Sequence, residues 1–186
     1  MKIPPQAKKV FTGEIFDVYH WDQEMFDGSH QTFEMLRRPD TTQVIATSGD
    51  KILMAYEEQP AKQGKYLTFF GGRIEKGEDP LAGAKRELIE ESGMESNDWE
   101  LFHTEVDFGK IEWTIYTYIA RNCTKTAKQS LDVGEKITIK EFSFEEFIEA
   151  CTAPGFVSVG MSMYLLRLQR EPEKLEEFRK KIFGNI

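Results

Sequence analysis

One stretch of the chain constrains its fold more than any other, and it begins with the short apolar run Tyr66–Phe70. This run leads directly into Gly71-Gly72, and a Gly77-Glu78-Asp79 turn follows. Asp79 is a typical N-cap, Pro80 suits the first helical position, and Gly93 is a typical residue just past a helix end. The sequence therefore predicts a strand, a tight turn and a helix with two fixed ends.

The predicted helix carries a stripe of charged side chains. Because each helical residue advances by about 100°, four of them fall within an arc of roughly 140°: Arg86, Glu87, Glu90 and Glu91. Closely packed carboxylates repel one another unless a cation lies among them, and oxygen ligands suit Mg²⁺ or Mn²⁺. An ordinary solvated face is the alternative. The lack of Lys or Arg four residues after each glutamate, and apolar residues on both flanks, favour a cation site.

The segment Gly72–Met94 resembles the signature of the Nudix hydrolases, which is Gly, five residues, Glu, seven residues, then Arg-Glu-apolar-x-Glu-Glu-x-Gly-apolar. The fixed positions are all filled, by Gly72, Glu78, Arg86, Glu87, Leu88, Glu90, Glu91, Gly93 and Met94. At average residue frequencies, the identities in this register arise by chance on the order of once in 10⁸ trials. The resemblance implies an α/β/α sandwich that hydrolyses a nucleoside diphosphate linked to another group, X.

The resemblance also implies roles for individual residues. Glu87, Glu90 and Glu91 would be ligands of Mg²⁺, with Mn²⁺ as a substitute, and the Gly71 carbonyl would be a fourth contributor. Arg86 would pair with Glu78 and orient the stripe. The cation would polarise a phosphoryl oxygen and lower the pKa of the attacking water.

Composition and charge limit the partners. The chain has 186 residues, 40% apolar and 30% charged, with a net charge of −8, which is typical of a soluble globular protein and argues against nucleic acid as a partner. Phosphate binding by such an acidic protein requires bridging cations. Apolar runs of only four or five residues predict no membrane span, and the N-terminus lacks a secretory pattern. The two cysteines, Cys123 and Cys151, favour a structural role in a reducing cytoplasm.

The order of the elements predicts the α+β class, with a mixed central sheet between helices and an N-terminal antiparallel β-hairpin extension. We expect an extension at 1–40, a Nudix domain at 41–170 and a C-terminal helix at 171–186. Residues 1–10 are expected to be a loose lead-in, and 121–134 a polar loop. Strands are predicted over Glu14–Met25, His30–Leu36, Thr42–Thr47, Lys51–Glu57, Tyr66–Phe70, Glu100–Phe108, Lys110–Ala120 and Glu135–Phe142. After the first helix, further helices are predicted from Ser143 to about Ala150 and over Ser158–Arg170 and Pro172–Phe183.

Features outside the signature resemble the ADP-ribose pyrophosphatase branch of the family: the hairpin, Glu58-Gln59 and the loop Leu131–Ile137. In that branch the N-terminal strands often exchange between the subunits of a homodimer and help form the adenosine pocket. The resemblance nominates Trp21 for stacking on the base, with simple packing as the alternative, and Arg37 and Arg38 for the terminal ribose or phosphate.

Two further parts of the site are nominated. The Gly72 backbone can approach a phosphate closely, because glycine has no side chain. A glutamate in the late loop of this branch assists the attacking water or a metal; Glu135 is the candidate and Asp132 the reserve.

The sequence thus predicts Mg²⁺-dependent hydrolysis of ADP-ribose, to AMP and ribose 5-phosphate, or of a related nucleoside diphosphate sugar. The residues that lead into the signature are Thr68-Phe69-Phe70-Gly71, where that branch usually has Leu-Pro-Ala-Gly. Other nucleoside diphosphate sugars therefore remain alternative substrates. The alternatives are a housecleaning nucleoside triphosphate pyrophosphatase and a non-catalytic nucleotide-binding Nudix module. RNA decapping fits the net charge of −8 poorly.

Overall fold

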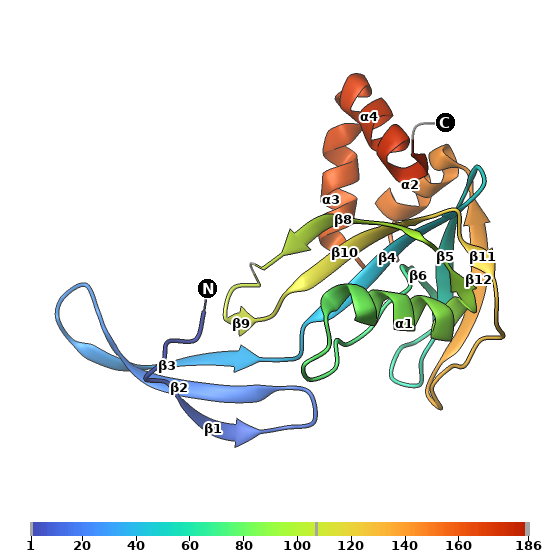
Figure 1. The fold of residues 1–186 in the computed structure, drawn as a ribbon. Helices are drawn as coiled ribbons and strands as arrows, with labels where there is room; N and C mark the ends of the chain where they lie inside the picture. The colour runs from blue at the N-terminus through green and yellow to red at the C-terminus, as the bar shows by residue number, and fades with distance from the viewer. Residues whose placement is uncertain (1, 107, 185–186) are drawn as a thin grey trace.

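The computed structural model describes residues 2–106 and 108–184, and Figure 1 shows their arrangement. The first strands are β1 (Lys8–Thr12), β2 (Asp17–Glu24), β3 (His30–Arg37), β4 (Thr41–Ser48), β5 (Lys51–Glu58) and β6 (Tyr66–Thr68). The later strands are β7 (Met94–Glu95), β8 (Asp98–Glu105), β9 (Ile111–Glu112), β10 (Ile115–Arg121), β11 (Thr124–Lys125) and β12 (Lys136–Phe142). The helices are α1 (Pro80–Ser92), α2 (Phe144–Thr152), α3 (Val159–Leu168) and α4 (Pro172–Phe183).

A mixed sheet with the strand order β12-β5-β4-β10-β8 forms the centre of the molecule, and β6 pairs with β5. Strands β4 and β10 run parallel, with Ile45 opposite Ile119, whereas the other neighbours are antiparallel. Helix α1 covers one face of the sheet, and α2, α3 and α4 lie on the other (Figure 1). The predicted α/β/α sandwich with a mixed sheet is confirmed.

Helix α1 packs on the sheet through Ala84 and Leu88, which are both fully buried. These residues lie four positions apart, so they share one helix face. They belong to a cluster with apolar residues of β4 and β5, namely Val44, Ala46, Leu53 and Ala55. Because this packing fixes the rotation of α1, it also fixes the direction in which the charged stripe points.

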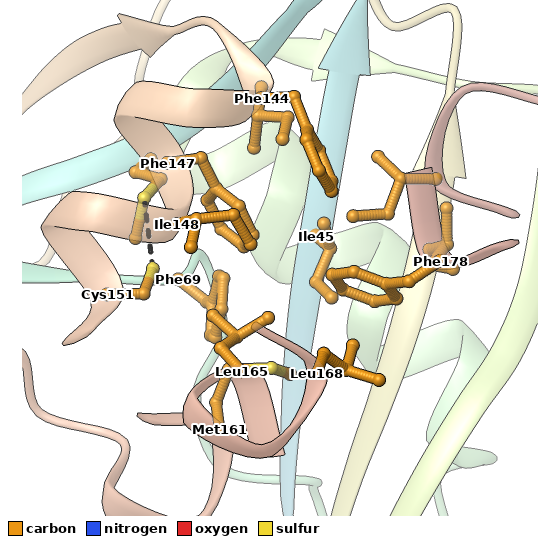
Figure 2. Close-up of a cluster of buried hydrophobic side chains, with 14 residues drawn as sticks. Ile45, Phe69, Phe144, Phe147, Ile148, Cys151, Met161, Leu165, Leu168 and Phe178 are labelled. Atoms are coloured by element: carbon orange, nitrogen blue, oxygen red, sulfur yellow. Dashed lines mark hydrogen bonds between the residues drawn. The ribbon is translucent and has the colours of Figure 1, made fainter. Parts of the chain in front are cut away.

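The opposite face of the sheet carries the larger apolar cluster. Figure 2 shows side chains of α2, α3 and α4 converging on Ile45 of β4, among them Phe147, Leu165 and Phe178. The predicted capping box of α2 is present, since the Ser143 side chain and Glu146 bond reciprocally. Both cysteines are free and buried, as a structural role requires.

A second sheet, with the order β1-β2-β3-β9, extends from the body of the molecule (Figure 1). Its β2–β3 hairpin is the predicted one, although β2 begins at Asp17 rather than Glu14. The expectation of a loose lead-in was wrong, because Lys8–Thr12 forms β1 and pairs with β2. All five side chains of β1 are exposed, so its sequence shows no alternation of apolar and polar residues that could reveal a strand.

The predicted strand Lys110–Ala120 is divided in two. Strand β9 pairs with β3 in the N-terminal sheet, and β10 pairs with β4 in the central sheet. Between them, Trp113 Nε1 donates to Thr41 Oγ1 over 2.9 Å, and the Thr114 amide donates to Asp40 Oδ1 over 2.8 Å. These contacts with the β3–β4 connection hold the crossing between the sheets, which continuous alternation in the sequence did not reveal.

Two smaller differences concern neighbouring segments. Strand β8 ends at Glu105, short of the predicted Phe108, and Asp107 within that prediction lies outside the described residues. The expected loop 121–134 contains β11, which pairs with β7 directly after α1. Within 2–106 and 108–184, no helix is long and apolar enough to cross a membrane.

Candidate active site

The ends of α1 are held as the sequence predicts. The Asp79 side chain accepts hydrogen bonds from the amides of Leu81 and Ala82, over 3.0 and 3.2 Å. At the other end, Gly93 has the left-handed backbone (φ 66°) and donates its N–H to the Ile89 carbonyl. Helix α1 therefore offers a rigid support for the side chains on its surface.

Arg86 is the hub of the charged stripe. Its Nε and Nη2 donate to the two oxygens of Glu78 over 3.0 and 3.1 Å, and Nη2 also donates to the Arg73 carbonyl over 3.0 Å. These hydrogen bonds lower the pKa of Glu78. The predicted contact between Arg86 and Glu78 is present, and it ties α1 to the turn before it.

No Lys or Arg lies four residues after a glutamate of the stripe, yet two of these glutamates have a cationic partner that precedes them. Arg86 Nη1 donates to Glu87 Oε1 over 2.8 Å and to Glu90 Oε2 over 3.0 Å. The partner of Glu90 precedes it by four residues, so a search of the four residues that follow misses it. The case against a solvated face now rests on burial, since the side chain of Glu87 is only 14% exposed.

Glu91 is the most deeply placed of these acids, at 6% exposure. One of its oxygens, Oε2, accepts the Gly71 amide over 2.8 Å. Burial raises the pKa of Glu91 to about 9, with further contributions from Glu87, Glu135 and Glu57, against the lowering effect of the Gly71 hydrogen bond. Burial likewise raises the pKa of Glu87.

The glycine pair before the turn is required by close contacts. Gly71 has φ 144°, and a Cβ there would lie 2.1 Å from the Thr42 carbonyl oxygen. A Cβ on Gly72 would lie 2.5 Å from Glu87 Oε1. The backbone contact excludes a side chain at Gly71, whereas a side chain at Gly72 would displace the Glu87 carboxylate, so the two glycines let the backbone lie directly against the carboxylates of α1.

The donor set fits a hard divalent cation. Glu87, Glu90 and Glu91 supply only oxygen atoms, and among the described residues no donor is bonded to the Gly71 carbonyl. Ionised Glu91 is costly at this depth without a cation, as its raised pKa shows. Across the described ranges, however, no three Asp, Glu, His or Cys side chains already converge as a metal cluster, and Arg86 holds two of the carboxylates.

These carboxylates line a cleft of about 920 Å³. The loop between β11 and β12, here called the late loop, contributes Ser130, Asp132 and Glu135. Glu57 comes from β5, and Gln59 follows that strand. The cleft is also lined by cationic side chains: Arg38, Arg73 and Lys76. The cleft therefore combines acidic groups that suit a cation with basic groups that suit an anion.

Both acids of the late loop reach the cleft. The Glu135 amide donates to the Asp132 carbonyl over 2.9 Å, and Glu135 Oε2 accepts the Asp132 amide over 3.3 Å. Burial raises the pKa of Glu135, and the Coulomb effects of Glu57 and Glu90 act in the same direction. Glu135 thus lies within the electrostatic influence of the stripe, although the loop starts nearly forty residues after α1 ends.

The two nominated arginines differ. Arg38 lines the cleft and stacks on Trp113, with 4.1 Å between the guanidinium carbon and the ring centre. Its Nε is buried and has no hydrogen-bond partner among the described residues, and burial with nearby Arg73 lowers its pKa. Arg37 lines a neighbouring cavity of about 860 Å³, where it pairs with Glu112 and donates to the Tyr19 hydroxyl over 2.9 Å.

Trp21 does not line the cleft of its own chain. It is 7% exposed, its ring centre lies 5.5 Å from that of Phe33, and its N–H donates to Gln23 over 2.8 Å. The prediction that Trp21 stacks on a base is not supported within one chain, and the alternative of simple packing describes it. Its place on a strand next to the turn does not distinguish the two roles, because both need an aromatic side chain there.

The cleft also includes residues that sequence reasoning did not nominate for the site, among them Glu57, Gln59 and Arg73. Glu57 had a detectable signal, since it follows the apolar residues Leu53 and Ala55 at the spacing of one strand face, where a buried acid is unexpected. Gln59 was noted only as part of the Glu58-Gln59 pair that resembles the ADP-ribose pyrophosphatase branch, with no role in the site, and nothing local distinguishes Arg73 from an ordinary loop residue. Their places in the cleft depend on the packing of distant segments.

Comparison with known proteins agrees with this geometry. The NUDIX domain model matches residues 37–157, which is more than half of the chain. The chain belongs to the NUDIX family, and its fold and site make it a Nudix hydrolase.

The relatives carry more particular names. The chain is 29% identical over 147 residues to the methanol dehydrogenase activator of Bacillus methanolicus, covering 77% of this chain and 80% of that protein. It is 25% identical over 147 residues to the ADP-ribose pyrophosphatase of Bacillus subtilis (strain 168), covering 76% and 78%. A crystal structure of an ADP compounds hydrolase matches with a TM-score of 0.73 at 18% identity, covering 91% and 94%, which demonstrates the shared fold.

Proposed function

We propose that this protein hydrolyses the diphosphate bond of ADP-ribose or of a related nucleoside diphosphate sugar, with Mg²⁺ as its cofactor. The observation that carries the proposal is Glu91, a buried carboxylate beside Gly71 at the floor of a cleft that also holds Glu87. The named ADP-ribose pyrophosphatase relative supports the choice of substrate. The products from ADP-ribose would be AMP and ribose 5-phosphate.

The stripe on α1 would hold the cofactor. Glu87, Glu90 and Glu91 are its proposed ligands, with the Gly71 carbonyl as a fourth, and Mn²⁺ is a suitable substitute because the donors are all oxygens. When bound, the cation polarises the phosphoryl oxygen and lowers the pKa of the attacking water. Arg86 orients the carboxylates through its bonds to Glu78 and releases Glu87 and Glu90 to the cation.

The remaining groups act on the substrate and the water. Glu135 accepts the proton of the attacking water, with Asp132 as the alternative on the same loop. Arg38 and Arg73, which also line the cleft, bind phosphate oxygens, and the Gly72 backbone allows the diphosphate to approach α1. Arg37 pairs with Glu112 in the neighbouring cavity, and from there it supports the part of the cleft that Arg38 lines.

We further propose that two copies associate through the N-terminal sheet. That sheet exposes apolar side chains, including Val10 (52%), Phe11 (60%) and Phe26 (114%), which favour burial against a partner. A cytoplasmic location is proposed from the two free thiols. Sedimentation of the purified protein measures its mass, and a monomer at micromolar concentration would contradict the dimer.

The decisive experiment measures products from a panel of nucleotides, with Mg²⁺ present and then chelated. The panel includes ADP-ribose, GDP-mannose, UDP-glucose, dinucleoside polyphosphates and the nucleoside triphosphates. We expect AMP from ADP-ribose, dependent on Mg²⁺ and faster than any product from the triphosphates. Preference for a triphosphate would favour a housecleaning enzyme. Tight nucleotide binding without turnover would favour a binding module.

A further inference from the structure

Glu57 is a buried acid outside the Nudix signature. It is 6% exposed and lies on the face of β5 that Leu53 and Ala55 direct toward α1. A carboxylate at this depth needs hydrogen-bond donors, because burial without them is costly. The structure places two groups that can donate beside Glu57, and one of them, Gln59, lines the cleft.

The first donor is Gln59, two residues further along the chain. Its Nε2 donates to Glu57 Oε1 over 2.5 Å, and its side chain lines the cleft. This hydrogen bond engages the NH₂ group of the Gln59 amide, which can only donate. The carbonyl oxygen of Gln59 is thereby left as the free acceptor of this amide.

The second donor is Tyr66, which lies opposite Glu57 in the pairing of β5 with β6. Burial, together with the nearby Glu57 carboxylate, raises the pKa of the Tyr66 phenol. The hydroxyl therefore stays protonated and is available as a donor beside Glu57. The measured hydrogen bond to this carboxylate is the one from Gln59.

The other polar groups that line the cleft include both hydrogen-bond donors and acceptors. Among the groups that line the cleft, Asp132 and Glu135 on the late loop offer carboxylate oxygens that can accept hydrogen bonds, whereas Arg38, Arg73 and Lys76 can only donate. A ligand in the cleft therefore finds both donors and acceptors in its lining. Phosphate groups suit the donors, and hydroxyl groups suit the acceptors.

We propose that Glu57 is a positioning residue that fixes Gln59 as a hydrogen-bond acceptor and so selects substrates in which group X carries hydroxyls, as a sugar does. This inference rests on the proposed function, because it assigns the X end of the same substrate to the β5 side of the cleft. Glu57 acts through Gln59 and touches neither the scissile bond nor the water. Its removal should therefore alter the choice of X more than the chemistry at the diphosphate.

The experiment compares ADP-ribose with the methyl ester of ADP, which has the same diphosphate but no hydroxyls on X. We expect the wild type to have a higher kcat/KM for ADP-ribose. The variant Glu57→Gln should reduce this preference about tenfold or more, mainly through KM for ADP-ribose, because a glutamine can also donate and no longer fixes the Gln59 amide. Hydrolysis of the methyl ester should change by less than about threefold, which also shows that the variant is folded.

The chain provides a matched control in Glu58. This neighbour is on the opposite face of β5, its side chain is 40% exposed, and it pairs with Lys136 over 3.4 Å. The variant Glu58→Gln should keep the wild-type preference. If it lost the preference as Glu57→Gln does, or if Glu57→Gln slowed both substrates equally, the inference would be overturned.

Two further variants protect the test against misfolding. Glu57→Asp keeps an acceptor-only carboxylate and should retain more of the preference than Glu57→Gln. Gln59→Met removes the proposed acceptor with little change of volume and should lose the preference while Glu57 stays in place. Retention of the full preference by Gln59→Met would contradict the role of Gln59, and with it the proposal.

Binding measurements separate this inference from the proposed function. Titration calorimetry with Ca²⁺ gives the affinities for ADP-ribose and for the methyl ester without turnover. If no nucleotide is hydrolysed, the proposed function falls, yet tighter binding of ADP-ribose that Glu57→Gln abolishes would still support the inference. Equal affinity of the wild type for both nucleotides would overturn the inference, whatever the activity.

Discussion

Glu91 combines two properties that oppose each other in a metal-free protein: it is an acid, and it is 94% buried, as its exposed fraction of 6% shows. Burial raises its pKa to about 9, while the Gly71 amide only partly offsets this effect. A divalent cation beside the carboxylate would reverse the balance, because opposite charge favours the ionised form. The residue is therefore suited to a site in which a cation is part of the working structure.

The first prediction concerns activity. We expect Glu91→Gln to lower kcat by a factor of about 100 or more, because the amide weakens binding and orientation of the cation. The fold should remain, since glutamine has nearly the same volume. Steady-state kinetics with ADP-ribose and circular dichroism measure both effects. Glu95→Gln, an exposed acid just after α1, is the control and should keep wild-type activity.

The second prediction concerns pH in the absence of divalent cations. The pKa of Glu91 is higher in the folded protein, about 9, than its ordinary value of 4.5, so the folded state holds the proton more tightly. This contribution to stability is fully present below pH 4.5 and is lost as pH rises through about 9. Between pH 6 and about 9.5, we expect the Tm of the chelated wild type to fall more than that of Glu91→Gln. Parallel curves would contradict the raised pKa.

Among the elements, α4 is attached to the sheet by a buried charge. Arg121 at the end of β10 is 7% exposed, and its Nε and Nη2 donate to the Lys181 carbonyl over 2.9 and 2.6 Å. Its Nη1 donates to Asp98 over 3.0 Å, and it also pairs with Glu100. A cation that binds a carbonyl in the last turn of a helix is favourable for the helix dipole as well.

The third prediction tests this attachment. Arg121→Met should lower the free energy of unfolding by about 2–4 kcal/mol, because it removes a buried cation and its hydrogen bonds to the Lys181 carbonyl and Asp98, although Glu100 keeps its pair with Lys181. The site on the other face of the sheet should keep its activity at low temperature. Urea denaturation measures the loss, and Arg170→Met, at an exposed arginine, should cost less than about 0.5 kcal/mol. Similar losses in both variants would contradict the attachment.

At the scale of the whole molecule, the cleft joins segments that are far apart in the chain. It takes Arg38 from the β3–β4 connection, Glu57 from β5, the stripe from α1 and Glu135 from the late loop. A ligand in the cleft therefore contacts several elements at once. Anything that binds only the folded protein stabilises it by mass action.

The fourth prediction follows from this arrangement. Millimolar Mg²⁺ should raise the Tm of the wild type by a few degrees, and more at pH 8.5 than at pH 6, because protons compete for the same carboxylates. Hydrogen exchange should slow in α1 and in the loop that contains Glu135. Glu87→Gln and Glu91→Gln should lose most of the shift, whereas Glu95→Gln should keep it. An equal shift in all variants would place the cation elsewhere.

The sequence alone determined the parts that depend on local spacing. The caps of α1, the shared face of Arg86, Glu87 and Glu90, and the contact of Arg86 with Glu78 all follow from residues within about two helical turns or an adjacent turn. The mixed sheet between helices was predictable as well, because strand and helix patterns alternate along the chain. Even here the cationic partner of Glu90 was not predicted, because Arg86 precedes Glu90 by four residues, whereas the expectation concerned only the residues that follow each glutamate.

Only the tertiary structure decided the rest. The exposed β1 has no buried face, so burial left no pattern in its sequence, and the division between β9 and β10 depends on pairing with two different sheets. Trp21 has the residue type of a base-stacking group, yet packing against Phe33 buries it. Glu57, Arg38 and Glu135 meet because strands distant in sequence become neighbours, and such long-range pairing is fixed by the packing of the whole core rather than by any local spacing.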